Sequence, residues 1–230
     1  MSLAAPPACR RCGTCCKNGG PALHCEDRTL VADGLIPARH LFTIRQGERV
    51  RDNVRGTLVS LDQEIVKIKG ANGRWTCTFF EEASKGCRIY DVRPLECRAL
   101  NCRDTRPIEA LYERTRLTRR DLLADVGGLW EVVLDHERRC SYARIAGLLG
   151  DGFENGVPIH DDAIQEMVRF DHHIRELTIE KAGVDERMLD FLFGRPLAET
   201  IKTFAMNGYP SSFFSKAVSP YSPGRRLGKK

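Results

Sequence analysis

Eight of the ten cysteines in this chain fall into two sets whose spacing is typical of metal ligands. The first set is Cys9-x2-Cys12-x2-Cys15-Cys16, and the second consists of Cys77, Cys87, Cys97 and Cys102. Thiolates are soft ligands, and several that converge from separate loops can hold a zinc ion or an iron–sulfur cluster. No apolar periodicity accompanies the first set, so core packing does not explain it. The sequence therefore predicts a metal site built from these eight thiols.

The spacing of the first set favours an iron–sulfur cluster of the 4Fe-4S type. Cys9, Cys12 and Cys15 recur at two-residue intervals, which lets one loop supply three corners of a cuboidal cluster while a distant thiolate supplies the fourth. We assign the fourth ligand to Cys97, because the preceding Arg93-Pro94 makes a stiff turn. Zinc is the alternative cofactor, since a four-thiolate structural zinc site needs only pairs of cysteines.

Adjacent residues usually direct their side chains apart, so we expect Cys15 and Cys16 to point in different directions. If the two side chains diverge, they either serve two metal centres or divide into one ligand and one packed thiol. We favour one main metal site with spare thiols. Secondary candidates for ligands are Cys25, His136 and Cys140. His136 and Cys140 lie one helical turn apart, but they follow the same apolar stripe as Val133, which favours core packing.

A second motif, Cys87-x2-Tyr90-x2-Arg93-Pro94-x2-Cys97, follows Cys77-x-Phe79. Together with the opening cluster, it resembles the bacterial CxxCxxCC family, also called the YkgJ-type cysteine-cluster family. The resemblance covers residues 9 to about 102. It implies a zinc- or iron-chelating role, and flagellin lysine methylases carry a similar cluster that is iron–sulfur. The resemblance does not by itself imply a particular reaction.

The composition is that of an ordinary globular protein, with 230 residues, 42% hydrophobic and 29% charged. The opening residues contain no apolar signal region, and no window approaches ~18 uninterrupted apolar residues. We therefore expect a cytoplasmic protein without a membrane span, whose cysteines are thiols or metal thiolates rather than disulfides. The Gly-rich stretch 150–156 fits neither a dinucleotide loop nor a calcium loop.

The pattern of apolar residues predicts an α+β fold, with a small Cys-rich metal-binding portion packed on a mostly α-helical C-terminal portion. Residues 28–50 suit two short helices, and residues 58–80 suit a β-hairpin turning at Gly70–Gly73 that presents Cys77. One apolar stripe runs from Leu122 to Leu149 and ends at the Gly-rich stretch. Further helices are expected at about 160–182, after Val184, and from Pro196 to about Met206. We divide the chain into portions at 1–106 and 107–206, with a disordered basic tail at 207–230.

Charge and motif content leave three classes of function open. The net charge is +5, and a group of arginines lies between Arg103 and Arg120. Interleaved Asp104, Glu109 and Glu113 should blunt its field, so nucleic acid is not an expected partner, whereas a protein partner is possible. The leading hypothesis is an accessory, electron-transfer or sensing protein with an iron–sulfur cluster. The alternatives are a structural zinc-binding interaction module and a cluster-dependent, methylase-like enzyme.

Overall fold

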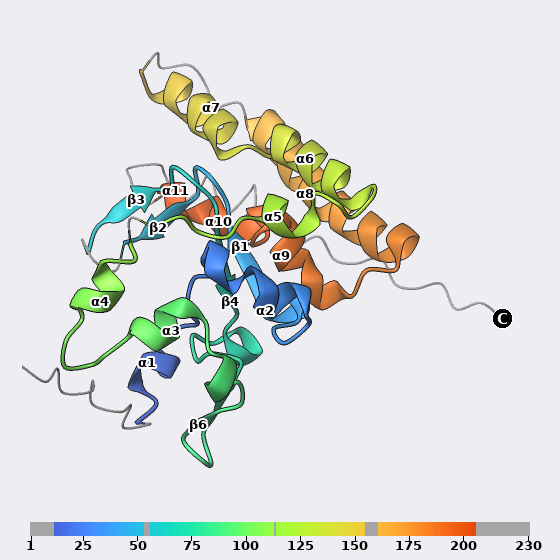
Figure 1. Ribbon diagram of the computed structural model, residues 1–230. Helices are drawn as coiled ribbons and strands as arrows, with labels where there is room; N and C mark the ends of the chain where they lie inside the picture. Colours follow the sequence, from blue (N-terminus) through green and yellow to red (C-terminus); the bar gives the residue numbers. More distant parts are fainter. Residues whose placement is uncertain (1–11, 53–55, 113, 155–160, 206–230) are drawn as a thin grey trace, which may run out of the picture.

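The computed structural model describes residues 12–52, 56–112, 114–154 and 161–205, and its fold is α+β, as predicted (Figure 1). Within these ranges, small antiparallel strand pairs and short helices form the cysteine-rich portion, and longer helices follow it along the chain. In Figure 1 the helices labelled α6, α7 and α8 lie at one end of the molecule, whereas α1, α3 and β6 lie at the other. The predicted tail, residues 207–230, is outside the described residues.

The central strand pair joins β1 (Leu41–Ile44) to β4 (Ile65–Ile68), with Leu41 opposite Ile68. The two short helices predicted within residues 28–50 are present only in the first part of that segment, and the second of them is a 3-10 turn. That segment contains α2 (Arg28–Ala32) and a single 3-10 turn (Ala38–His40) before it becomes β1. The residues of β1 alternate between buried and half-buried, which is the two-residue period of a strand with one covered face.

The strands around Gly70–Gly73 are paired differently from the prediction. A turn is present, since the Ala71 N–H donates to the Thr76 carbonyl at 2.6 Å, but only an isolated bridge joins Gly70 to Cys77. The reason is that both edges of β4 are occupied: β1 pairs with one edge, and residues 21–23 bond to the other, where the Leu23 N–H donates to the Val66 carbonyl and the Ile68 N–H donates to the Pro21 carbonyl. The remaining described pairs are β2 (Arg49–Arg51) with β3 (Leu58–Ser60), and β5 (Phe80–Glu81) with β6 (Gly86–Cys87). The β5–β6 pair is the hairpin of the cysteine-rich portion.

Short helices complete this portion: α1 (Thr14–Lys17), α3 (Leu95–Ala99) and α4 (Arg106–Glu109). The C-terminal portion contains α5 (Arg119–Leu123), α6 (Leu129–Arg139), α7 (Tyr142–Glu154), α8 (Asp161–Ala182), α9 (Leu189–Phe193), α10 (Leu197–Thr200) and α11 (Lys202–Ala205). None of the helices within the described ranges has the length and apolar character needed to cross a membrane.

The predicted apolar stripe from Leu122 to Leu149 is divided among α5, α6 and α7, and it is not a continuous buried face. Val126 lies between helices and is 44% exposed, and Leu134 is 39% exposed on α6. The expected break at residue 150 is also wrong, because α7 continues to Glu154. Glycine costs a helix only about 1 kcal/mol per residue, so Gly150 and Gly152 do not end it.

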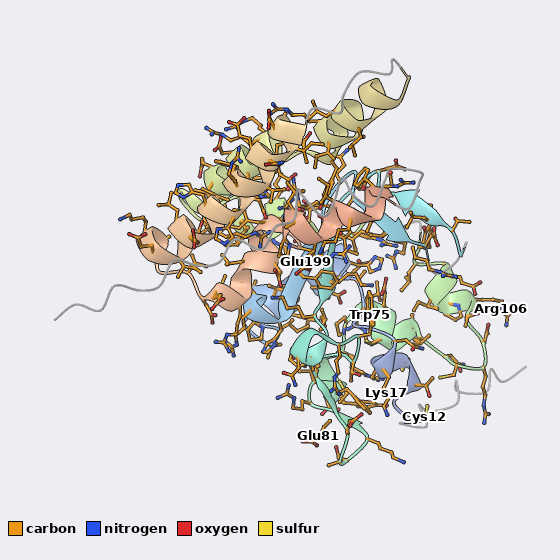
Figure 2. The ribbon with its side chains drawn as sticks, turned by 180° about the vertical axis from the view of Figure 1, so that it is seen from behind. Cys12, Lys17, Trp75, Glu81, Arg106 and Glu199 are labelled. Carbon is orange, nitrogen blue, oxygen red and sulfur yellow. The ribbon has the colours of Figure 1, made fainter. Side chains whose placement is uncertain are left out.

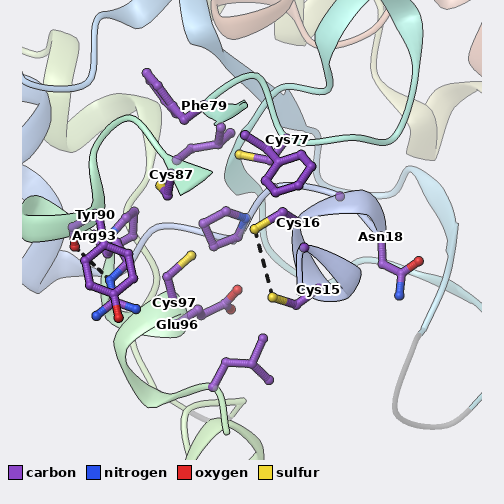
Figure 3. Close-up of a pocket in the computed structure, with 18 of the residues that line it drawn as sticks. Cys15, Cys16, Asn18, Cys77, Phe79, Cys87, Tyr90, Arg93, Glu96 and Cys97 are labelled. Atoms are coloured by element: carbon purple, nitrogen blue, oxygen red, sulfur yellow. Dashed lines mark hydrogen bonds between the residues drawn. The ribbon is translucent and has the colours of Figure 1, made fainter. Parts of the chain in front are cut away.

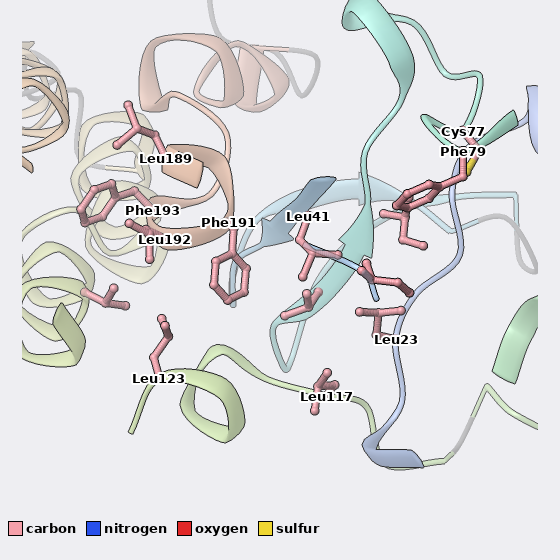
Figure 4. Packing of buried hydrophobic residues seen from close by; sticks show 14 residues of the cluster. Leu23, Leu41, Cys77, Phe79, Leu117, Leu123, Leu189, Phe191, Leu192 and Phe193 are labelled. Carbon is pink, nitrogen blue, oxygen red and sulfur yellow. The ribbon is translucent and has the colours of Figure 1, made fainter. Parts of the chain in front are cut away.

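A single cluster of buried apolar residues unites the two portions (Figure 4). It contains Leu23, Leu41 and Phe79 from the cysteine-rich portion together with Leu123 from α5 and the apolar residues of α9. Cys77 belongs to the same cluster. The core therefore reaches from the long helices to the wall of the cysteine-rich end, and it supports the position of Cys77.

Buried ion pairs add a second connection between the portions. Arg45, just after β1, is fully buried, and it donates hydrogen bonds to both carboxylate oxygens of Glu137 on α6, at 2.7 and 2.9 Å. Arg119 of α5 donates to the same Glu137 carboxylate at 2.7 Å and to Glu64 at 2.9 Å. Burial by itself would raise the pKa of Glu137, but the two guanidinium groups outweigh it and lower the pKa to about 2.

Candidate metal centre

One cavity of about 740 Å³ gathers seven of the eight cysteines predicted as ligands (Figure 3). The seven are Cys12, Cys15, Cys16, Cys77, Cys87, Cys97 and Cys102. The eighth, Cys9, lies outside the described residues. The cavity is formed where three separate segments meet: the α1 loop, the region from Cys77 to β6, and the turn that leads into α3. The tertiary structure thus brings together thiols that lie far apart in the sequence.

The first segment turns sharply at Gly13 before α1. Gly13 has a φ of 76°, and a Cβ at this position would lie 2.4 Å from a ring carbon of Phe80, so only glycine allows so close an approach. The α1 turn then directs both Cys15 and Cys16 to the cavity, with their sulfur atoms 3.9 Å apart. The expectation that these two thiols point in different directions is wrong.

The second segment supplies Cys77 and Cys87. The backbone N–H of Cys77 donates to the carbonyl of Cys16 at 2.7 Å, which ties this segment to α1. Cys77 is 8% exposed, and Cys87 lies in β6 opposite Phe80 of β5. In Figure 3 these two thiols lie above Cys97 and Cys15. The short hairpin therefore positions Cys87, while the apolar core positions Cys77.

The third segment is the turn that carries Cys97 into α3. Arg93 is extended, with a φ of −59° and a ψ of 142°, and Pro94 precedes the first helical residue. The Nε of Arg93 donates to the Tyr90 carbonyl at 2.8 Å, and its guanidinium carbon lies 3.7 Å from the centre of the Tyr90 ring. The predicted stiffness of this turn therefore has two sources, proline and a stacked arginine.

Two carboxylates anchor α3 to the loop that follows α1. The buried Asp27 accepts a hydrogen bond from the backbone N–H of Leu95 at 2.9 Å. Glu96 accepts one from the backbone N–H of Ala22 at 2.8 Å, and its second oxygen lies 3.4 Å from Nε2 of the buried His24. These contacts fix the first and third segments relative to each other, although the cysteine motifs do not specify any of these residue types.

The thiols away from the exposed rim of the cavity are close enough to influence one another electrostatically. Burial raises the pKa of Cys97 to about 12, and the neighbouring Cys77, Cys87 and Cys15 add to the increase. Burial also raises the pKa of Cys77, with a further contribution from Cys87. A bound cation reverses this effect, because its charge stabilises thiolates. Cys15, Cys16, Cys77, Cys87 and Cys97 are called the inner thiols below.

Cys15 and Cys16 behave as a pair that shares a proton. A hydrogen bond from Cys16 lowers the pKa of Cys15 to about 6, and the same contact raises the pKa of Cys16. The first ionisation of the pair is therefore easy and the second is difficult. Arg93 also lowers the pKa of Cys15. This side of the cavity thus offers a thiolate that is available near neutral pH.

Cys12 and Cys102 lie at the exposed rim of the cavity. The Cys12 thiol is 3.4 Å from the hydroxyl of Thr14, and this hydrogen bond lowers its pKa. Figure 2 shows Cys12 at the outer end of the cysteine-rich portion, close to Lys17 of α1. The cavity therefore has buried and exposed thiols, a distinction that the spacing of the motifs does not reveal.

The secondary candidates lie away from the cavity. Cys25 is exposed, and its sulfur is 3.7 Å from the carbonyl of Arg116. His136 lies on α6 and Cys140 directly follows that helix, and both side chains are buried. His136 Nε2 contacts Asp171 Oδ1 at 2.7 Å, and the Cys140 thiol donates to the Met167 carbonyl at 3.4 Å. This arrangement agrees with the interpretation of the pair as packed core residues.

The donor set of the cavity fits a thiophilic metal. All nine cysteines that the structure describes are free thiols, and seven line this one space. In the described part of the chain, no three His, Cys, Asp or Glu side chains are placed closely enough to hold one metal ion. The thiols thus surround a shared cavity without meeting at its centre. Soft sulfur donors of this kind select zinc or iron–sulfur centres.

Lys67 and Glu96 also line the cavity, although neither residue was predicted from the sequence to belong to the site. One signal was available for Lys67: it is a charged residue within the otherwise apolar strand Ile65-Val66-Lys67-Ile68. Glu96 directly precedes a predicted ligand, Cys97, but a glutamate at the start of a helix is too common to be informative.

The fold and the cavity together define a class of protein: a small α+β domain whose many thiols line one cavity that can hold a metal ion or a metal cluster. Residues 8–121 match the CxxCxxCC family, described as a "putative zinc- or iron-chelating domain", and this part of the chain belongs to that family. The suspected resemblance is thereby confirmed, and so is a general metal-binding role. The match extends from the opening cysteines into α5. No curated protein and no solved structure matches the chain.

Proposed function

We propose that the cavity binds an iron–sulfur cluster of the 4Fe-4S type, and that the protein uses it in an accessory, electron-transfer or sensing role. The observation that carries this proposal is the cavity itself, where seven thiols from three segments surround about 740 Å³. Pockets of about 300–1,000 Å³ accommodate small organic molecules, so the space exceeds what a bare ion needs. A polynuclear cluster, which takes its thiolates from several directions, suits such a space.

Four of the inner thiols are the proposed ligands: Cys15, Cys77, Cys87 and Cys97. Cys15, Cys77 and Cys87 all raise the pKa of Cys97 through their charge, and Cys15 and Cys87 act on Cys77 in the same way. Cys16 lies 3.9 Å from Cys15 and can donate its S–H to the ligand sulfur. Such hydrogen bonds to sulfur are one of the means by which proteins tune these centres. Cys9, Cys12 and Cys102 remain alternative ligands.

A cluster held there supplies one-electron transfer, and the surrounding residues control its environment. Phe79, Phe80 and Ile89 give the cavity an apolar wall that limits access of water. Arg93 places a positive charge on the side of Cys15, whose thiolate it stabilises. The arginine favours an anionic group in the cavity, whereas the apolar wall shields that group partly from solvent.

The test is anaerobic purification followed by visible spectroscopy and by assays for iron, acid-labile sulfide and zinc. Iron and sulfide in equal amounts, with broad visible absorption, would support the proposal. Replacing Cys77 by Ser should remove both. Cys25→Ser is the matched control, because Cys25 lies outside the cavity, and it should keep the wild-type metal content. A colourless protein with stoichiometric zinc would contradict the iron–sulfur assignment.

A structural zinc site is the second candidate, and one distance favours it. The sulfurs of Cys15 and Cys16 are 3.9 Å apart. With Zn–S bonds of about 2.3 Å, tetrahedral geometry places neighbouring sulfurs about 3.8 Å apart. This pair could therefore occupy one edge of a zinc tetrahedron, with two other inner thiols moving inward. In that case the domain would serve as a rigid module for binding a partner.

A further inference from the structure

The cavity wall carries an excess of positive charge in addition to its thiols. Lys67, Lys85, Arg93 and Arg103 line the cavity, whereas Glu96 is the only carboxylate among the described residues that line it. Glu96 is already engaged by the Ala22 N–H and the His24 ring. The four cations therefore have little negative charge opposite them within the protein.

Lys67 is the most unusual of these cations. It lies in β4 between the buried Val66 and Ile68, and it is itself only partly exposed. Within the described residues, no hydrogen bond or ion pair engages its ammonium group; Glu96 attracts it from a distance, but burial outweighs this attraction and lowers the pKa of Lys67. The nearby Lys69, in contrast, lies 3.0 Å from a carboxylate oxygen of Asp190 and donates to the Arg187 carbonyl at 2.7 Å. A largely buried, unpaired ammonium group is costly unless a ligand satisfies it.

Arg93 presents its guanidinium to the same cavity in a fixed orientation. Its Nε donates to the Tyr90 carbonyl, and the group stacks on the Tyr90 ring at 3.7 Å, as Figure 3 shows beside Cys97. No described carboxylate forms an ion pair with Arg93. A planar guanidinium held in this way is pre-organised for an oxyanion, because it loses little side-chain freedom on binding one.

A metal centre held by four thiolates does not neutralise all of the positive charge on the cavity wall. Four thiolates exceed the charge of a zinc ion, or of an oxidised four-iron core, by only two negative charges. Four cations and one engaged carboxylate therefore leave a positive excess after the metal is bound. A cavity of about 740 Å³ also has room for more than the metal.

We propose that the cavity binds a small oxyanion, a molecule bearing a carboxylate or phosphate group, beside the metal centre and in contact with Lys67 and Arg93. The inference rests on the proposed function for the position of the metal, whereas the cations line the cavity with or without it. The ligand is a substrate or effector that approaches the metal through the open side of the cavity, past the exposed Arg103.

The test is calorimetric titration at low ionic strength with two probes, inorganic phosphate and succinate. Metal-loaded and metal-free forms of the full chain are titrated separately. We expect saturable binding of at least one probe, with a stoichiometry near one. Lys67→Met should weaken it roughly tenfold or more, because a charged hydrogen bond is lost. Lys67→Arg should retain most of the affinity, and Lys69→Met, the matched control outside the cavity, should leave it unchanged.

Different results would separate this inference from the proposed function. If neither probe binds, or if Lys67→Met binds like the wild type, the oxyanion site is refuted. If Lys67→Met instead lowers the metal content without any anion binding in the wild type, Lys67 balances the thiolates and the inference is wrong. If the protein holds no metal but metal-free protein binds a probe through Lys67, the proposed function fails and the oxyanion site remains.

Discussion

Removing the negative charge of Glu137 should destabilise the protein strongly, although this residue is not part of the cysteine cavity. Its carboxylate accepts hydrogen bonds from the buried guanidinium groups of Arg45 and Arg119. Glu137→Gln keeps the size of the side chain and imitates the protonated carboxyl group. The substitution therefore leaves Arg45 buried without a counter-ion, which is the situation in which buried ion pairs matter most.

The magnitude follows from the pKa of Glu137, which is lowered from 4.5 to about 2. A shift of one pKa unit corresponds to about 1.4 kcal/mol, so the charged form is stabilised by about 3 kcal/mol relative to the neutral form. The side chain of Glu137 is 27% exposed, so solvent screening removes only part of this energy. For a chain of this length, the expected loss corresponds to a decrease in Tm of about 6–12 °C.

The assay is urea unfolding at pH 7, followed by far-ultraviolet circular dichroism, with thermal unfolding as a second measurement. Glu131→Gln is the matched control, because Glu131 lies on the same helix and is exposed. It should change the free energy of unfolding by less than about 1 kcal/mol. Metal content should be unchanged in both variants, since neither residue lines the cavity. Equal stability of the two variants would refute the reasoning.

Three further predictions concern the metal site and the interior. Cys97→Ser should lose the metal, measured by elemental analysis, whereas Cys140→Ala should retain it, and a wild-type metal content in the first variant would overturn the ligand assignment. Burial lowers the pKa of His136 below its ordinary 6.5. Below that pH the unfolded state therefore binds more protons than the folded state, so stability decreases as the pH falls. The midpoint of urea unfolding should decrease between pH 7 and pH 5.5. His136→Gln should reduce this dependence of the urea midpoint on pH. An unchanged pH dependence in that variant would contradict the role given to His136. Gly13→Ala should destabilise the α1 loop and weaken metal binding, because its φ is 76° and its Cβ would lie 2.4 Å from Phe80; normal metal affinity in that variant would show that the loop can relax.

Local chemistry made the cysteine cluster predictable. The spacing of Cys12, Cys15 and Cys16, and the Arg93-Pro94 turn before Cys97, depend on residues close together in the chain. The same is true of the helices α6 and α8, whose apolar residues recur with a helical period. The strand partner of β4 was not predictable in this way. Pairing with β1 depends on a segment that is distant in the sequence, and short apolar runs suit helix and strand almost equally well.

The sequence by itself determined the type of donor, the number of thiols and the family to which residues 8–121 belong. These properties depend on which amino acids are present and on their spacing, and the fold does not alter them. Only the tertiary structure decided that Cys16 faces the cavity beside Cys15, that Cys25 and Cys140 do not reach it, and that Lys67 does. The physical reason is that a cavity is formed by packing between distant segments, so the burial and charge of each side chain depend on neighbours that the local sequence does not specify.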